Sequence, residues 1–183
     1  MTKTEARKLA KACRTAVDLH TVGHAMAGVL FTLPAWQHAD TVLAFASMPD
    51  EPDTADILRQ ALAEGKRLLL PRVLSRTEMD WVEITALSQL QPGAYGILEA
   101  PASLPAFDTA HLGDGALALI PCLAASPDGV RLGRGCGYYD RFLAHYKGRR
   151  LLVCPTAALL GDLPCEGWDV RFSPHEILTE KGI

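Results

Sequence analysis

The sequence lacks the features that mark membrane, disulfide-bonded and nucleic-acid-binding proteins. No apolar run in it approaches the roughly 18–20 residues that a helix needs to span a bilayer. The five cysteines are an odd number and include no Cys-x-x-Cys pair, so neither a disulfide framework nor a structural zinc site is expected. A formal net charge of −3 gives no overall attraction to nucleic acid or anionic lipid. We therefore expect a cytoplasmic protein without a membrane or nucleic-acid partner.

Linkers, internal repeats and low-complexity tracts are also missing. The chain has 183 residues, 49% of them apolar, which is enough for one domain with a substantial core. Its basic N-terminus has no secretory apolar segment, and Glu5 and Asp18 are untypical of a transit peptide. We expect residues 1–183 to form a single domain that includes this N-terminus.

Short apolar runs alternate with helical patterns along most of the chain. Residues 41–46 and 67–70 have the continuous apolar character of buried strands, and the helical pattern between them begins at Asp53 or Thr54 and stops at Gly65. Further strands are expected at 79–84, 116–120 and 151–154, and a further helix at 138–146. This order predicts a three-layer α/β fold with a largely parallel sheet.

The N-terminal region has a helical pattern with two different faces. Residues 3–31 contain no proline and predict one long helix, or two helices with a break near Gly23. At about 100° per residue, one arc is apolar: Ala6, Leu9, Ala10, Cys13, Ala16 and Val17. The neighbouring arc is basic: Lys3, Arg7, Lys11 and Arg14. A basic stripe in this position is either a solvated face or one wall of a cleft beside the core.

Residues 131–141, Arg-Leu-Gly-Arg-Gly-Cys-Gly-Tyr-Tyr-Asp-Arg, form the stretch richest in functional groups. Glycine weakens regular elements by roughly 0.5–1 kcal/mol relative to alanine, so glycines at alternate positions need another explanation. They allow backbone N–H groups to approach an anion, and Arg131 and Arg134 add forked donors suited to phosphate. The glycines alone fit a tight surface turn equally well, but the arginines favour a phosphate loop. Asp140 is either a metal ligand or a first-turn acid favoured by the helix dipole.

A second polar loop, residues 47–54, follows the strand at 41–46 and contains three acids. Asp53 or Thr54 is readily explained as a helix cap, whereas Glu51 is not. In open α/β sheets, ligands bind beyond the carboxyl ends of the strands, where this loop and the glycine loop are both expected. The position favours a functional role for Glu51.

The number of cations near the glycine loop suggests a polyphosphate ligand. Arg131 and Arg134, with Lys3, Arg7 or Arg14 from the N-terminal helix, exceed what one monophosphate needs. ATP is one such ligand, and it normally binds with Mg²⁺ held by one or two carboxylates. Asp140 and Asp169 are candidates for that role. Spacing and charge do not identify a second substrate.

Several segments together resemble the 5-formyltetrahydrofolate cyclo-ligase family, also called methenyltetrahydrofolate synthetases. They are Lys3-x-x-x-Arg7, the Phe-Ala-Ser-Met-Pro-Asp-Glu-Pro-Asp-Thr run at 45–54, Gly96-Ile97-Leu98-Glu99, the glycine stretch at 129–141 with its Gly-Tyr-Tyr-Asp-Arg end, Leu163-Pro164 and Trp168-Asp169. The resemblance covers nearly the whole chain in order. It implies a fold similar to that of sugar-phosphate isomerases and glucosamine-phosphate deaminases.

The resemblance also implies a reaction, in which 5-formyltetrahydrofolate, possibly polyglutamylated, is cyclised to 5,10-methenyltetrahydrofolate with ATP and Mg²⁺ as cofactors. We further expect a monomer, and the resemblance assigns the site residues. ATP is expected on Lys3, Thr4, Glu5, Ala6 and Arg7, and on Arg131, Leu132, Gly133, Arg134, Gly135, Cys136, Gly137, Tyr138 and Tyr139. Folate is expected near Ala46, Met48, Glu51 and Tyr139, and Mg²⁺ at Asp140 and Asp169. The catalytic candidates are Glu51 for the folate nitrogens, and Arg134 with Arg7 for the transferred phosphoryl group.

The sequence departs from the family pattern at a few positions. Ala125-Ser126 stands where the family usually has Phe-Asp, and Ala158 where it commonly has glutamine. These departures are expected to reshape the folate pocket more than the nucleotide loop. Two other functions stay open at this point: an isomerase of sugar phosphates that needs no ATP, and a non-catalytic binder of folate or nucleotide on the same scaffold.

Overall fold

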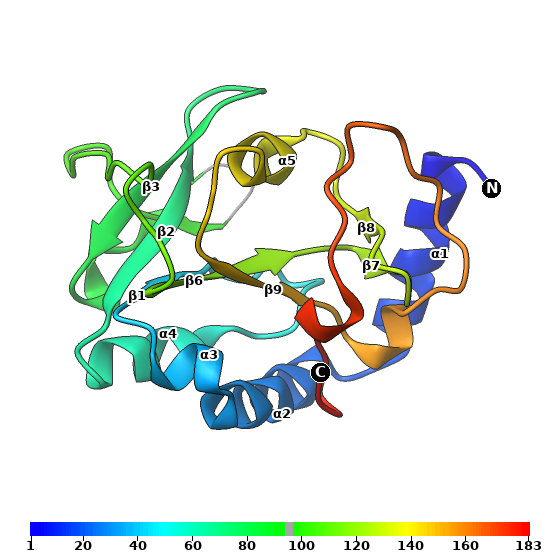
Figure 1. Ribbon diagram of the computed structural model, residues 1–183, viewed down its shortest axis with the longest axis horizontal. Coiled ribbons are helices and arrows are strands. Elements are labelled where there is room, and N and C mark those ends of the chain that lie inside the picture. Colours follow the sequence, from blue (N-terminus) through cyan, green and yellow to red (C-terminus); the bar gives the residue numbers. More distant parts are fainter. Residues whose placement is uncertain (94–96) are drawn as a thin grey trace.

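A twisted sheet runs through the centre of the molecule, with helices on both faces (Figure 1). The computed structural model describes residues 1–93 and 97–183. The sheet strands within these residues are β1 (Thr41–Leu43), β2 (Arg67–Val73), β3 (Met79–Ile84), β6 (Ala116–Pro121), β9 (Arg149–Val153) and β10 (Ile177–Leu178). They pair in the order β10-β9-β6-β1-β2-β3, with all neighbours parallel except β3, which is antiparallel to β2. The predicted α/β fold with a largely parallel sheet is confirmed.

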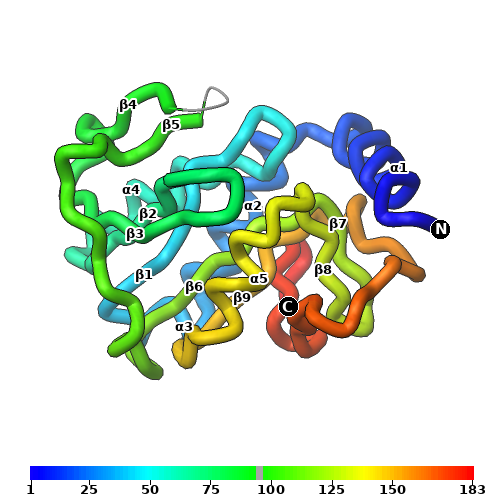
Figure 2. The backbone as a smooth tube through the Cα atoms, turned by 90° about the horizontal axis from the view of Figure 1, so that it is seen from above, coloured from blue at the N-terminus to red at the C-terminus, as the bar shows by residue number. Residues whose placement is uncertain are grey.

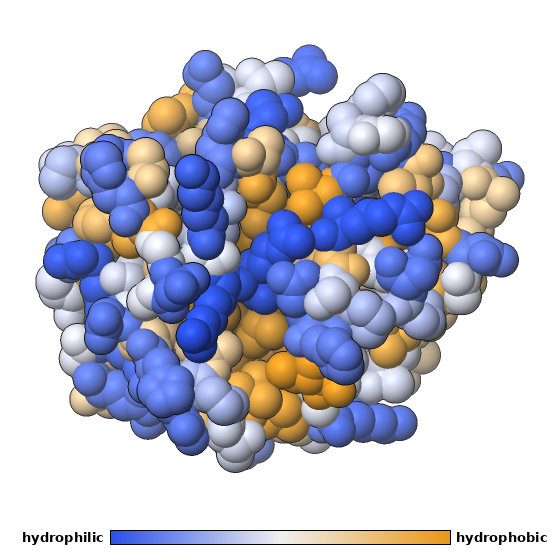
Figure 3. Space-filling model, in the orientation of Figure 1, coloured by the Kyte–Doolittle hydropathy of each residue, from blue (hydrophilic) through white to orange (hydrophobic). Residues whose placement is uncertain are grey.

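The remaining elements surround this sheet. The helices are α1 (Lys3–Thr15), α2 (Leu19–Thr32), α3 (Pro34–Gln37), α4 (Ala55–Ala63) and α5 (Tyr138–Leu143), with short 3₁₀ turns η1 (Leu87–Gln89), η3 (Thr156–Ala158) and η4 (Pro174–Glu176). Two small antiparallel pairs join β4 (Gln91–Pro92) to β5 (Leu98–Glu99) and β7 (Ala124–Ala125) to β8 (Arg131–Leu132). The face seen in Figure 3 is largely hydrophilic, with apolar surface near its centre.

Alternate side chains of the central strands build two separate core layers. Val42 and Leu68 point to the layer covered by α2, α3 and α4, whereas Leu43 and Leu69 point to the layer covered by α1 and α5. This explains why the central strands are apolar throughout, since both of their faces are buried. The result is a three-layer arrangement of helices, sheet and helices.

In the described part of the chain, no helix has the length and apolar character needed to cross a membrane.

The N-terminal region forms two helices, but they are not divided at Gly23 as the sequence suggested. α1 ends at Thr15, and Asp18 caps α2 by accepting a hydrogen bond from the His20 N–H. Gly23 lies inside α2, where it allows the helix to approach the backbone of Asp53. The prediction missed this because a glycine needed for close packing has the same sequence signature as a helix break.

Replacing Gly23 with alanine is expected to lower the free energy of unfolding by about 1–3 kcal/mol, a cost typical of overpacking. An added Cβ would lie 2.2 Å from the Asp53 carbonyl oxygen and 2.4 Å from the Asp53 nitrogen. Gly28 in the same helix has no described atom within 4 Å of its Cβ position. Gly28→Ala should therefore raise the free energy of unfolding by about 0.5–1 kcal/mol. Urea denaturation of both variants tests this, and equal losses would contradict it.

The strands begin and end at slightly different residues from those predicted. β1 is shorter than the predicted 41–46, and β2 continues through Pro71 to Val73 rather than ending at the proline. The neighbouring β1 stops opposite Leu69, so the missing N–H of Pro71 lies beyond the parallel pairing. α5 ends at Leu143, before the predicted Tyr146. The predicted bounds of β3 are confirmed.

Candidate functional site

A cavity of about 940 Å³ lies beyond the carboxyl ends of the parallel strands. Its walls come from α1, the loops after β1 and β6, the end of β2, the glycine loop, α5 and residues 166–169. This volume is near the upper end of the range of about 300–1,000 Å³ for small-molecule sites. The two polar loops identified from the sequence therefore line one cavity.

The glycine loop, residues 133–137, leads from β8 into α5 and lines the cavity throughout its length. Gly135 and Gly137 have φ values of 105° and 69°, which disfavour residues with a side chain. In the described part of the chain, no backbone carbonyl accepts a hydrogen bond from the N–H groups of this loop. A row of unused donors beside arginines is an anion-binding arrangement.

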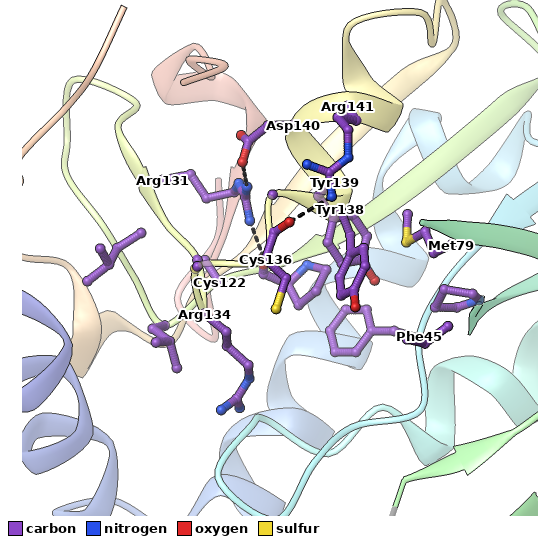
Figure 4. A pocket seen from close by; sticks show the side chains of 18 of the residues that line it. Phe45, Met79, Cys122, Arg131, Arg134, Cys136, Tyr138, Tyr139, Asp140 and Arg141 are labelled. Atoms are coloured by element: carbon purple, nitrogen blue, oxygen red, sulfur yellow. Dashed lines mark hydrogen bonds and ion pairs between the residues drawn. The ribbon is translucent and has the colours of Figure 1, made fainter. Parts of the chain in front are cut away.

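Arg131 is held in a fixed position at the base of this loop. Its Nη2 donates to Asp140 Oδ2 at 2.7 Å, and its Nη1 donates to the Pro121 carbonyl at 3.3 Å (Figure 4). The buried Nε has no partner among the described residues. The guanidinium also lies over the Tyr139 ring, at 5.9 Å from its centroid. Arg131 is thus anchored where the glycine loop begins, and its Nε is a donor without a partner among the described residues.

The first turns of α1 bring two cations to the cavity wall beside the glycine loop. Arg7 Nε donates to the Gly133 carbonyl at 3.1 Å, so α1 is tied directly to the glycine loop. Lys3 pairs with both Glu166 and Asp169, the latter at 2.8 Å. Of the predicted basic stripe, Lys3 and Arg7 therefore line the cleft.

The rest of the basic stripe does not line the cleft, since Lys11 is exposed, as on a solvated face, and Arg14 is buried. Arg14 is 1% exposed and donates from Nη1 to the Cys122 carbonyl at 2.9 Å, whereas the predicted core residue Leu9 is 45% exposed. Ala6, Ala10 and Arg14 form the buried line of α1, because the helix packs on η3 and β8 along that line. The apolar arc predicted from sequence periodicity is therefore rotated about the helix axis relative to the face of α1 that is buried.

Glu51 is the most buried acid in the cavity wall, at 8% exposure. Its Oε1 accepts hydrogen bonds from Arg134 Nη2 at 3.0 Å and Nε at 3.3 Å, and its Oε2 accepts from the Met48 N–H at 3.0 Å. Arg134 Nη2 also donates to Asp50 at 2.6 Å. Arg134 therefore joins the glycine loop to the acidic loop across the cavity.

The acidic loop is fixed by its own polar side chains. Buried Thr54 donates from Oγ1 to the Phe45 carbonyl at 2.7 Å, and the same Oγ1 accepts from the Ser47 N–H at 3.1 Å. Thr54 is also the N-cap residue of α4, and Asp53 before it accepts a hydrogen bond from the Ala55 N–H at 2.8 Å. Of the two capping candidates, Thr54 is thus the N-cap residue and Asp53 supplies the side-chain hydrogen bond, whereas Glu51 takes part in neither.

Tyr139 stands between the two polar loops. Burial, reinforced by the nearby Glu51 carboxylate, raises the pKa of its phenol far above the ordinary value, so it stays protonated. Trp81 packs against its ring edge at a centroid distance of 6.4 Å. Tyr138, beside it, donates from its hydroxyl to the Ser75 carbonyl at 2.7 Å. Figure 4 shows both tyrosine rings near Phe45.

One end of the cavity is apolar, which the sequence did not indicate. The residues there share an apolar side chain and come from four different segments: Phe45, Leu70, Pro71, Val73, Met79, Ile97 and Leu98. The sequence placed Leu70 and Pro71 at a strand end, but the hairpin that brings Val73 and Met79 to the cavity depends on long-range pairing. Gly96, part of the matching family segment, lies outside the described residues.

The candidate metal ligands are both in the cavity wall, and both are paired with cations. Asp140 pairs with Arg131, and Asp169 with Lys3. Burial opposes ionisation of Asp169, but hydrogen bonds from Lys3 and from the Glu166 N–H outweigh it and hold its pKa below the usual range. No group of three or more acidic, histidine or cysteine side chains in the described residues could hold a metal ion. The residues fit an Mg²⁺ ion carried by phosphate oxygens, because such an ion needs one or two carboxylates.

Three of the residues predicted for ATP do not line the cavity. Thr4 is exposed on α1, Glu5 accepts from the Thr2 N–H at 2.7 Å as part of a capping box, and Ala6 is buried in the core. Every other residue predicted for ATP, folate or metal is part of the wall.

The residues that depart from the family pattern do not line the cavity either. Ala125, Ser126 and Ala158 are all fully buried, in or beside the core layer under α1. They do not line the cavity, so an effect of these departures on the folate pocket would have to be indirect, and that effect stays a prediction.

Comparisons with known proteins agree with this geometry. A 5-formyltetrahydrofolate cyclo-ligase from Mycolicibacterium smegmatis is 30% identical over 78% of this chain and 75% of its own. The enzyme of that name from Escherichia coli is 30% identical over 81% of this chain and 84% of its own. The solved structure of 5,10-methenyltetrahydrofolate synthetase from Aquifex aeolicus has a TM-score of 0.83 and 26% identity, covering 100% of this chain and 91% of that one. The model of the 5-formyltetrahydrofolate cyclo-ligase family matches residues 3–180, and the chain belongs to this family.

Proposed function

We propose that the protein converts 5-formyltetrahydrofolate to 5,10-methenyltetrahydrofolate, using ATP and releasing ADP and phosphate. The observation that carries the proposal is the Arg134 bridge, which joins a loop of unused N–H donors to the buried Glu51 carboxylate. A reaction that couples phosphoryl transfer to chemistry on a second molecule needs both kinds of group in one cavity. Among the functions considered from the sequence, an isomerase would need no such loop for a polyphosphate.

The proposed reaction has two steps. The formyl oxygen attacks the γ-phosphorus, the bond to ADP breaks, and a phosphorylated formyl group results. N10 then attacks the formyl carbon, the carbon–oxygen bond breaks, phosphate leaves and N10 loses its proton. Phosphoryl transfer depends mainly on positioning and charge stabilisation, which arginines and backbone N–H groups supply.

The nucleotide side of the cavity has the donors for the first step. Residues 133–137 would bind the phosphates through N–H groups, with Arg7 from α1 in contact with this loop and Lys3 one turn before Arg7. Arg134 would stabilise charge on the transferred group, since it is the cation nearest to Glu51. Mg²⁺ carried by ATP would neutralise phosphate charge, with Asp140 and Asp169 as its protein ligands.

The folate side has a carboxylate and an apolar surface. Glu51 would accept a hydrogen bond or the proton from the reacting folate nitrogens, and the Tyr139 hydroxyl beside it would donate one. Ala46 and Met48 flank Glu51, and the apolar end of the cavity would take the flat rings of the folate.

The proposal also includes a cytoplasmic monomer with a fold similar to that of sugar-phosphate isomerases.

The proposal is tested by following methenyltetrahydrofolate absorbance with purified protein and 5-formyltetrahydrofolate. We expect formation that requires both ATP and Mg²⁺, with ADP released in equal amount. Formation without ATP would indicate a different mechanism. Folded protein that binds ATP and folate but gives no product would favour the non-catalytic alternative.

Replacing Asp140 with asparagine is expected to raise the Mg²⁺ concentration for half-maximal turnover about tenfold or more, because a carboxylate ligand is lost. Asp128→Asn is the matched control, since Asp128 pairs with Arg171 on the surface and does not line the cavity. Asp140 also pairs with Arg131, so thermal unfolding of both variants must be compared. Equal Mg²⁺ dependence in the two variants would remove Asp140 from the metal site.

A further inference from the structure

Trp168 combines high exposure with a place in the cavity wall. Its side chain is 74% exposed, whereas Trp36 and Trp81 are 1% and 3% exposed. A large aromatic side chain gains free energy when it is covered, and the place of Trp168 in the cavity wall makes its ring available to a bound ligand. None of the roles proposed above for the binding of ATP or folate involves Trp168.

The short segment 166–169 holds Trp168 in place. Lys3 pairs with Glu166 before it and with Asp169 after it, and the Glu166 N–H donates to Asp169 Oδ2 at 2.7 Å. The Asp169 N–H donates back to the Glu166 carbonyl at 3.0 Å. Figures 1 and 2 both show this orange segment beside the first turns of α1. The exposed ring is therefore carried on a turn anchored at both ends to the cation at the start of α1.

The position of Trp168 relates it to the nucleotide rather than to the folate. The γ-phosphate must lie near Arg134 and Glu51, where the two substrates meet. Trp168 lies between Glu166 and Asp169, which both pair with Lys3. Arg7, one turn further along α1, contacts the glycine loop, so Trp168 belongs to the part of the wall that α1 and the phosphate loop form. Leu70 and Met79 come from the neighbouring strands β2 and β3, and the apolar surface that they help to form suits the folate.

We propose that Trp168 is the stacking platform for the adenine base of ATP, an inference that rests on the proposed function. Stacking on an aromatic side chain suits any nucleobase, since every base has a π face. The ring would contribute affinity for the base and none for the phosphates. It would also orient the nucleotide so that its terminal phosphate points toward Arg134.

The test measures binding, independently of turnover. Acrylamide, a neutral quencher, should reach Trp168 and not the buried Trp36 and Trp81. We expect MgATP to protect the fluorescence from quenching, and inorganic tripolyphosphate to bind without protecting it. Protection by 5-formyltetrahydrofolate alone, with none by MgATP, would overturn the proposal.

Substitutions separate stacking from a structural effect. Trp168→Ala is expected to weaken ATP binding about tenfold, which corresponds to about 1.4 kcal/mol, and to leave tripolyphosphate binding unchanged. Trp168→Phe should restore most of the ATP affinity. Equal weakening of both ligands, or unchanged ATP affinity, would overturn the proposal. The absorbance assay on the same preparations shows separately whether the proposed reaction occurs, so ATP stacking without turnover would contradict the proposed function and leave the role of Trp168 intact.

Discussion

Glu51→Gln is expected to lower kcat by about 10²–10³-fold while the protein stays folded, a loss typical of removing a general acid or base. Glutamine has nearly the same shape, but it carries no charge and turns one acceptor into a donor. In the wild type both carboxylate oxygens accept hydrogen bonds, from Arg134 and from the Met48 N–H. One of these bonds is therefore lost, together with the proton acceptor proposed for the folate nitrogens. Single-turnover formation of methenyltetrahydrofolate measures the effect.

Asp50→Asn is the matched control for this variant. Asp50 accepts a hydrogen bond from the same Arg134 nitrogen but is more exposed than Glu51, with side-chain values of 36% and 8%. Burial opposes the ionisation of Asp50, yet Arg134 outweighs it and holds the pKa of that carboxyl below its usual range. We expect Asp50→Asn to change kcat less than tenfold, since exposed ion pairs contribute about 0.2–1 kcal/mol. Near-normal turnover of folded Glu51→Gln would remove Glu51 from the mechanism.

The parts of this site that the sequence predicted are those controlled by local chemistry. The glycines at 135 and 137 have positive φ values, as the phosphate-loop interpretation required. β1, which precedes Glu51, and β6, which leads through β7 and β8 to the glycine loop, both end at the cavity, because parallel strands share one carboxyl edge. These features depend on residues close together in the chain, so a pattern of residue types is enough to indicate them.

The parts that the sequence missed depend on contacts between distant segments. The burial of Arg14 follows from how α1 packs on η3 and β8, and no pattern within α1 distinguishes Arg14 from Lys11. Lys3 and Asp169 are brought together by the path of the C-terminal segment over α1. The pairing of Arg134 with Glu51 likewise requires two loops to meet, although each loop alone was identified as functional.

Arg134→Lys is expected to lower kcat by about 10²–10³-fold with a smaller change in KM for ATP, as when one transition-state donor is removed. Lysine keeps the charge but cannot reproduce the forked contact, in which Nη2 reaches both Asp50 and Glu51 while Nε also reaches Glu51. Arg171→Lys is the control, because Arg171 also pairs with a carboxylate, that of Asp128, outside the cavity. A raised KM with unchanged kcat would mean that Arg134 binds the ground state and transition state equally.

The double variant Glu51→Gln with Arg134→Lys separates two roles for the contact between these residues. If Glu51 acts solely by holding Arg134, the double variant loses no more activity than Arg134→Lys alone, because the second change removes a support that is no longer used. If Glu51 also acts on the folate nitrogens, the losses accumulate. We expect the double variant to be slower than either single variant but faster than the product of their effects predicts, since residues in contact share part of their contribution. A double variant equal to Arg134→Lys would assign Glu51 a positioning role and leave the proton acceptor to another group in the cavity.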